Sequence, residues 1–213
     1  MEATRIIAIR HGETAWNVDT RIQGQLDIGL NATGRWQAHR AALALAGETI
    51  AAVYSSDLLR AWETALSVAN AVGQNVVTDE GLRERGFGVF EGKTFAEIGE
   101  LWPDQALLWR RRDPAFCPEG GENLIQFRDR ILRAVQGLAS PHLGQQIVVV
   151  AHGGVMDVLY RAATRQEVQA PRTWDLGNAT INRLLWTPGG LSIVGWADTH
   201  HLDENTALDE FAD

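Results

Sequence analysis

Residues 147–154 read IVVVAHGG, and residues 5–12 read RIIAIRHG. Each stretch contains a short apolar run that is followed closely by a histidine and a glycine. Short apolar runs rich in β-branched residues are typical of strands that are buried on both faces, as in parallel sheets. The two stretches therefore predict two central strands of an α/β fold, each with a histidine at its carboxyl end.

Further strands and helices are expected to alternate along the chain. We expect strands at 50–54, 76–78, 180–186 and 191–197, the last two joined as a hairpin by Pro188-Gly189-Gly190. Helices are expected at 31–45 with Asn31 as cap and at 57–72 with Asp57 as cap. Further helices are expected in two pieces over 94–112, the first with Thr94 as cap, at 122–139 and from 153 to 165. This order predicts a three-layer α/β/α sandwich with a mostly parallel sheet and a mixed edge, in one domain over residues 1–213. The acidic tail from Asp203 is predicted to be mobile.

Composition limits the classes of partner. The chain of 213 residues carries a net charge of -8, so its surface as a whole should repel nucleic acid and anionic membranes. Cys117 is the only cysteine, which excludes an internal disulfide. The N-terminal apolar run is too short for a signal peptide or a membrane span, which predicts a cytoplasmic protein. A homodimer is compatible with the sequence, which does not define the oligomeric state.

The two histidine–glycine pairs predict an anion site. The carboxyl ends of strands in an open α/β sheet border the ligand crevice, so His11 and His152 are expected to face one pocket. Gly153 begins a helix, whose free N–H groups favour an anion. Arg10 and Arg60 are expected to reach the same edge and to supply planar charged groups suited to phosphate oxygens.

The sequence also resembles the histidine phosphatase superfamily, in its phosphoglycerate mutase-like branch. The resemblance covers nearly the whole chain in the order typical of that family, through the motifs Arg10-His11-Gly12-Glu13-Thr14, Trp16-Asn17, Gln23-Gly24, Ser55-Ser56-Asp57-Leu58-Leu59-Arg60-Ala61, Leu82-Arg83-Glu84, Phe90-Glu91-Gly92, Gly120-Gly121-Glu122 and Ala151-His152-Gly153-Gly154. One such motif alone is weak support, whereas the ordered set is specific.

The resemblance implies a mechanism and a set of site residues. His11 is the expected nucleophile, and Glu84 is the expected proton donor and acceptor. Arg10, Arg60 and His152, with Asn17 nearby, are expected to hold the phosphoryl oxygens. Gln23, Gly24 and Gly153 are further expected substrate-binding residues. No metal and no cofactor is required. His11 must be neutral to attack, whereas His152 is more useful when protonated, so we expect their surroundings to differ.

The resemblance leaves three functions open. The stretch Glu84-Arg85-Gly86-Phe87-Gly88 and the stretch Gln23-Gly24-Gln25-Leu26-Asp27 look more like the phosphatase members than like the mutases, so we favour a phosphomonoester hydrolase acting on a small phosphorylated metabolite. A cofactor-dependent phosphoglycerate mutase is the first alternative. A non-catalytic phospho-ligand-binding module is the second, and it would predict loss of one of the two histidines.

Two further groups could contact substrate, but we favour a purely structural role for each. Arg21 could touch substrate, but we favour an ion pair with Asp19 or Asp27. The segment Trp109-Arg112 could form a lid over the substrate, but we favour a solvated basic helix end.

Overall fold

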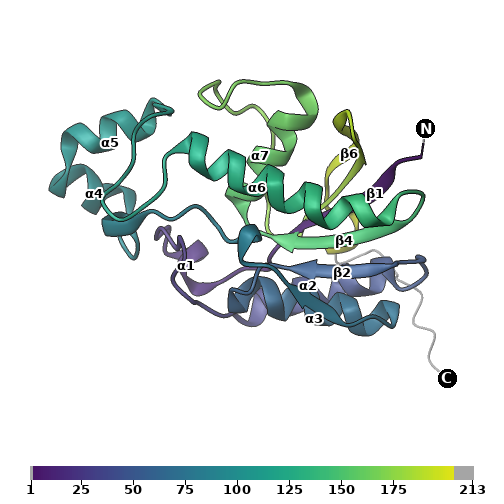
Figure 1. Ribbon diagram of the computed structural model, residues 1–213. Helices are drawn as coiled ribbons and strands as arrows, with labels where there is room; N and C mark the ends of the chain where they lie inside the picture. The colour runs from purple at the N-terminus through teal and green to yellow at the C-terminus, as the bar shows by residue number, and fades with distance from the viewer. Residues whose placement is uncertain (1, 204–213) are drawn as a thin grey trace.

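A mixed six-stranded sheet forms the centre of the computed structural model, which describes residues 2–203 (Figure 1). The strand order is β3-β2-β4-β1-β5-β6. The strands span Thr4–Arg10 (β1), Ala52–Ser55 (β2), Val76–Thr78 (β3), Gln146–Ala151 (β4), Ile181–Thr187 (β5) and Gly190–Asp198 (β6). Strands β1 to β4 run parallel, β5 is antiparallel to β1, and β6 is antiparallel to β5. The predicted mixed edge is therefore confirmed.

Helices cover both faces of this sheet. Helices α2 (Ala32–Leu45) and α3 (Leu59–Val72) lie on one face, and α6 (Leu124–Ala139) and α7 (Gly153–Thr164) lie on the other (Figure 1). Side chains of β4 alternate between the two cores, with Val148 and Val150 toward α2 and α3, and Val149 toward α6 and α7. The continuous apolar run of this strand is explained by burial on both faces, and the predicted three-layer architecture is confirmed.

A helical lobe extends beyond the carboxyl ends of the parallel strands. It consists of α4 (Phe95–Leu101) and α5 (Pro103–Arg110), and the single turn α1 (Ala15–Val18) lies between it and the sheet (Figure 1). Thr94 caps α4, as predicted, in a reciprocal capping box with Glu97. Phe90 and Ile98 anchor the lobe through a small core of its own. One side of the predicted pocket is therefore helical.

The predicted cap at Asp57 is wrong. Helix α3 begins after Leu58, and the N–H of Leu59 donates to Asp27 Oδ1 at 2.7 Å. Asp57 instead accepts two bonds from the guanidinium of Arg83. A bidentate pair with a guanidinium group makes two bonds between opposite charges, whereas a cap makes one bond to an uncharged N–H, so the distant arginine determines where this carboxylate lies.

Two further points concern the C-terminal region. His200 and His201 lie in a 3-10 turn, η4 (His200–Leu202), where His200 is exposed and His201 is buried, so they act as surface and packing groups. The predicted mobile tail lies, after Asp203, outside the described residues. Within the described part of the chain, no helix has the length and apolar character needed to cross a bilayer.

Candidate active site

The two predicted histidines meet at one edge of the sheet. Strands β1 and β4 are adjacent and parallel, with Arg10 opposite Ala151, so the residue after each strand emerges side by side. The ring centroids of His11 and His152 are 5.3 Å apart, in an edge-to-face arrangement. The strand pairing thus produces a close pair of imidazoles.

Hydrogen bonding fixes the tautomer of His11. Its Nδ1 lies 2.7 Å from the carbonyl oxygen of Gly12, which can only accept, so Nδ1 carries the proton and Nε2 keeps its lone pair. Asn178, a residue that no motif indicated, holds the backbone carbonyl of His11 at 3.0 Å. Burial, followed by the charges of Arg60 and Arg10, lowers the pKa of His11 well below its usual value. His11 is therefore a neutral imidazole with a free nitrogen.

The two histidines share a lowered pKa but differ in their hydrogen bonds. His152 is fully buried, and its pKa is also well below the usual value, through burial first and then through Arg60 and His11. Neither ring nitrogen has a hydrogen-bond partner among residues 2–203. The protein's own charges therefore favour the neutral form of His152. A dianionic phosphate beside the ring would oppose this effect.

The guanidinium groups of half-buried Arg10 and fully buried Arg60 lie around the histidines. Arg10 donates to the carbonyl of Leu176, and Arg60 donates to the carbonyls of Gly24 at 2.8 Å and Leu26 at 2.9 Å. The Nε atoms of both arginines are buried without a partner in the described chain. Burial lowers the pKa of Arg60 to about 10, which still leaves it charged at neutral pH. Arg60 therefore supplies charge and also fixes the position of the loop that contains Gly24.

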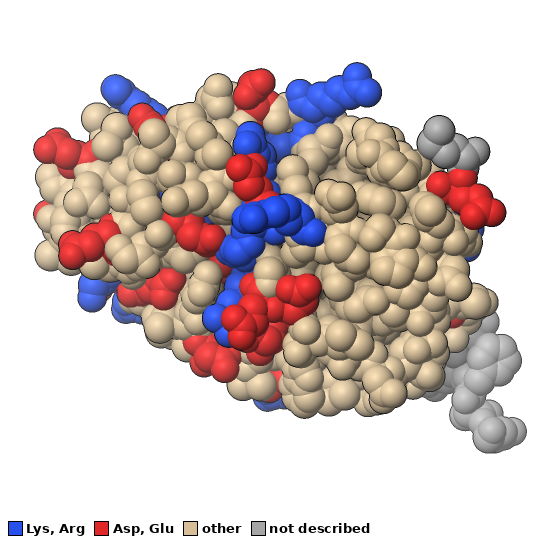
Figure 2. Space-filling model, in the orientation of Figure 1, with Lys and Arg blue, Asp and Glu red and all other residues tan. Residues whose placement is uncertain are grey.

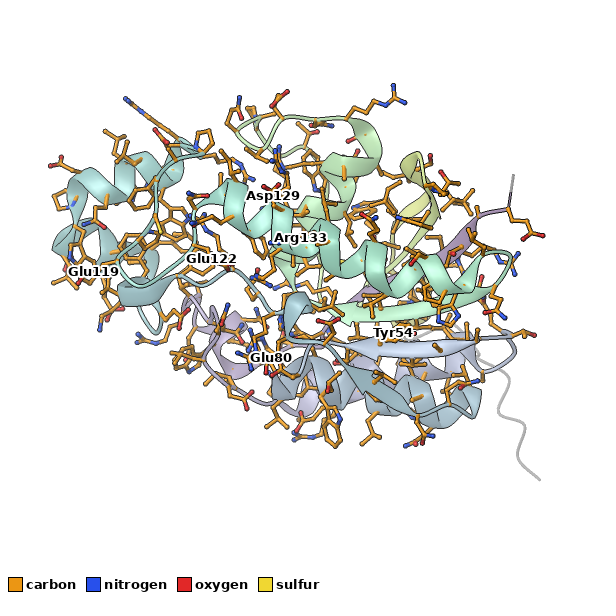
Figure 3. The ribbon with its side chains drawn as sticks, in the orientation of Figure 1. Tyr54, Glu80, Glu119, Glu122, Asp129 and Arg133 are labelled. Carbon is orange, nitrogen blue, oxygen red and sulfur yellow. The ribbon has the colours of Figure 1, made fainter. Side chains whose placement is uncertain are left out.

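Glu84 lies at the N-terminus of α7. Its Oε2 accepts from the N–H of Gly154 at 2.9 Å, and its Oε1 accepts from the N–H of Arg85 at 2.8 Å. Arg130 on α6 donates to the carbonyls of Gly81, Arg83 and Glu84 and forms a bidentate pair with Glu122. Figure 3 labels Glu122, which lies just before α6, and the N–H of Glu122 donates to the carbonyl of Gly86 at 2.8 Å, two residues after Glu84. This clamp, which the motifs did not reveal, positions the Glu84 loop.

One cavity of about 560 Å³ collects most of the predicted residues. Its lining includes Arg10, His11, Asn17, Gln23, Gly24, Arg60, Glu84 and Gly153. His152 is fully buried beside His11 and is not part of the lining. Asn17 Oδ1 accepts from Thr14 and Asn178, and Gln23 Oε1 accepts from Thr14. These bonds leave the amide nitrogens of Asn17 and Gln23 as donors for a ligand.

The cavity is basic although the protein is acidic. Its lining has two carboxylates, Glu84 and Asp157, and eight arginines, Arg10, Arg21, Arg60, Arg85, Arg112, Arg128, Arg161 and Arg172. Figure 2 shows basic side chains in a band between the helical lobe and the body of the molecule, with acidic side chains beside them. An anionic ligand is therefore favoured at this site.

The structural roles predicted for Arg21 and for the segment Trp109-Arg112 need correction. Arg21 lines the cavity and pairs with Glu97 at 3.2 Å, not with Asp19 or Asp27, because α4 brings Glu97 close. Trp109 and Arg112 also line the cavity, so these two are not a solvated helix end. Arg112 bonds to Asp157 at 2.8 Å, which turns its side chain inward.

Fold and site together define a class: an α/β protein with a buried pair of imidazoles and two guanidinium groups around an anion pocket. The family model of the histidine phosphatase superfamily (branch 1) matches residues 6–199. The chain belongs to this superfamily.

Individual relatives cover nearly the whole chain. The phosphoglycerate mutase-like protein 4 of Arabidopsis thaliana is 40% identical over 213 residues, which is 98% of this chain and 91% of the relative. The metal-independent phosphoserine phosphatase of the same plant is 37% identical and covers 94% of this chain and 84% of its own length. The phosphoserine phosphatase of Entamoeba histolytica, solved with 3-phosphoglyceric acid, superposes with a TM-score of 0.82 at 30% identity over 94% of this chain and 100% of its own.

Names among the relatives include both activities. Glucosyl-3-phosphoglycerate phosphatases of mycobacteria match at 34–37% identity, and probable phosphoglycerate mutases of Yersinia match at 33–34%. The comparisons support a phosphomonoesterase better than a mutase.

Proposed function

We propose that this protein is a metal-independent phosphomonoester hydrolase that acts on a small phosphorylated metabolite through a phosphohistidine. The observation that carries the proposal is the state of His11: a buried, neutral imidazole whose Nδ1 is bound to Gly12. Its Nε2 is free to attack phosphorus within a basic cavity. A neutral nitrogen nucleophile of this kind needs no general base for its activation.

The first step transfers the phosphoryl group to the enzyme. Nε2 of His11 attacks phosphorus, the ester P–O bond breaks, and the leaving oxygen takes a proton from Glu84. Arg10, Arg60 and the N-terminus of α7 at Gly153 bind the three remaining oxygens, whose charge the transition state spreads among them. The electrostatic stabilisation is preorganised, because Arg60 and Glu84 are held by backbone groups.

The second step releases phosphate. A water molecule attacks the phosphohistidine, Glu84 accepts its proton, and the N–P bond breaks to restore the neutral His11. Two displacements, each with a positioned proton carrier, replace one difficult hydrolysis. His152, 5.3 Å from the His11 ring, is suited to donate a hydrogen bond to a phosphoryl oxygen.

Relatives define the kind of substrate that we propose. Their names include a phosphoserine phosphatase and glucosyl-3-phosphoglycerate phosphatases, and a solved relative was studied with 3-phosphoglyceric acid. A three-carbon phosphate or a glycosylated form of one fits a cavity of about 560 Å³. Cytoplasmic location, the single domain and a homodimer are kept as predictions.

Hydrolysis of p-nitrophenyl phosphate tests the proposal. We expect turnover without added metal, no effect of EDTA, and loss of turnover in His11→Ala. Retention of activity in that variant, or activity that needs a metal after EDTA, would refute the mechanism. Incubation with 3-phosphoglycerate separates the alternatives: release of phosphate supports the phosphatase, and formation of 2-phosphoglycerate without phosphate supports the mutase. A protein that binds these compounds but turns over none of them is a binding module.

A further inference from the structure

Unpartnered buried polar atoms occur in two places in the molecule. Within residues 2–203, four of the six such side-chain atoms belong to Arg10, Arg60 and His152, around the phosphoryl position. The other two are Asp157 Oδ1 and Trp174 Nε1. Buried polar groups normally have partners, and those that lack one need an explanation. The first group is explained by the phosphoryl oxygens, and the second group has no role in the mechanism.

Asp157 lies on the same wall as the phosphoryl position. Gly153, Asp157 and Arg161 are spaced by four residues on α7, so they share one helix face, and all three line the cavity. The rise of an α-helix places Asp157 about 6 Å from Gly153 along the axis. A group joined to the phosphate by two or three bonds therefore comes near Asp157.

The two oxygens of Asp157 have different surroundings. Oδ2 accepts from Arg112 at 2.8 Å and from Arg161 Nε at 2.9 Å. Arg112 and Arg161 are held in turn by the carbonyls of Val168, Glu167 and Ala170. Asp157 is 7% exposed, and its Oδ1 makes no bond to any described residue. This network fixes the position of the Asp157 carboxylate and leaves its Oδ1 without a donor among the described residues.

We propose that Asp157 Oδ1 accepts a hydrogen bond from a hydroxyl group in the leaving portion of the substrate, and so selects hydroxylated phosphomonoesters. This inference rests on the proposed function. A neutral hydroxyl is favoured over an ammonium group, because two guanidinium groups bind the same carboxylate and a third, Arg172, lines the same cavity. A bound substrate that lacks the hydroxyl would leave this charged acceptor buried without a donor, which would weaken the binding of that substrate.

Three compounds with one carbon skeleton test the proposal. At C2, 3-phosphoglycerate carries a hydroxyl, 3-(phosphonooxy)propanoate carries hydrogen, and O-phospho-L-serine carries an ammonium group. Their dissociation constants are measured by calorimetry with full-length His11→Ala, so that binding is read without turnover. We expect 3-phosphoglycerate to bind at least about tenfold more tightly than either of the others, as one hydrogen bond to a charged group implies.

Variants of the network distinguish recognition from structure. Adding Asp157→Ala should reduce the ratio between the first two compounds to about one. Adding Arg112→Gln, which removes a donor to Oδ2 and leaves Oδ1 in place, should keep the preference. Both variants lose the ion pair between Arg112 and Asp157, and Asp157→Ala also loses the pair with Arg161. Thermal unfolding of each variant measures its structural cost separately from the change in binding.

Several results would overturn the subsite. These are equal affinities for the first two compounds, a preference that survives Asp157→Ala, a preference that Arg112→Gln abolishes, or tightest binding of phosphoserine. Failure of all three to bind, while the wild type hydrolyses p-nitrophenyl phosphate, overturns the subsite and leaves the proposed function intact. Failure of both binding and hydrolysis overturns both.

Discussion

Replacing Glu84 by glutamine separates the two proton transfers that the mechanism assigns to this side chain. The amide can neither give a proton to the leaving oxygen nor take one from water. With 3-phosphoglycerate, the leaving alkoxide needs a proton, so we expect kcat to fall by about 10²–10⁴-fold, the usual contribution of general acid–base catalysis. With p-nitrophenyl phosphate, the leaving anion is stable, so phosphorylation of His11 should stay within about tenfold of wild type.

The second step should then be slow with both substrates. Stopped-flow absorbance of Glu84→Gln with p-nitrophenyl phosphate should show a burst of one nitrophenolate per enzyme, followed by slow turnover. The structure also implies a cost in stability. Glu84 accepts from two backbone N–H groups, of which the amide can satisfy only one, so the free energy of unfolding should fall by about 1–3 kcal/mol.

Glu91 provides a matched control. Its Oε1 accepts from the N–H of Gln25 at 3.0 Å and of Phe87 at 2.9 Å, but Glu91 does not line the cavity. Glu91→Gln keeps one oxygen that can accept both bonds, so it should cost less stability than Glu84→Gln and should produce no burst. The reasoning is refuted if Glu84→Gln slows phosphorylation equally with both substrates, or if Glu91→Gln accumulates the phosphoenzyme.

Two further predictions concern stability. A methyl group on Gly12 would lie 2.3 Å from the carbonyl oxygen of Gly34, so Gly12→Ala should lower the free energy of unfolding by about 1–3 kcal/mol. The control Gly137→Ala adds a methyl group in open space on α6 and should be neutral or stabilising. Equal melting temperatures of the two variants would contradict this prediction. Burial lowers the pKa of His11 and His152 well below 6.5, so the unfolded chain takes up protons below about pH 6.5 while the folded protein does not. Denaturant titrations should show the free energy of unfolding decreasing from pH 7 to pH 5, by up to about 1.4 kcal/mol per histidine and pH unit. The dependence of this free energy on pH should be weaker in His152→Asn. An unchanged pH dependence in that variant would contradict the lowered pKa of His152.

Local pattern predicted most of the fold and the centre of the site. The apolar runs before His11 and His152 predicted two central strands, and these strands lie side by side in the structure. The capping box at Thr94 was readable because its partner lies only three residues away. Residues whose surroundings depend on distant chain were missed: Asp57 binds Arg83, 26 residues away, and Asn178 reaches His11 across 167 residues. No local pattern contains such pairs, because tertiary packing decides them.

The pairing of β1 with β4 has a consequence for how such an enzyme changes over time. A slip of one residue in this pairing would turn one imidazole to the opposite face of the sheet, so a single insertion in either strand should abolish the chemistry outright. The helical lobe and the loop after α7 are free of that constraint. Changes in these outer segments can therefore alter the range of substrates during evolution, while the reaction itself stays the same.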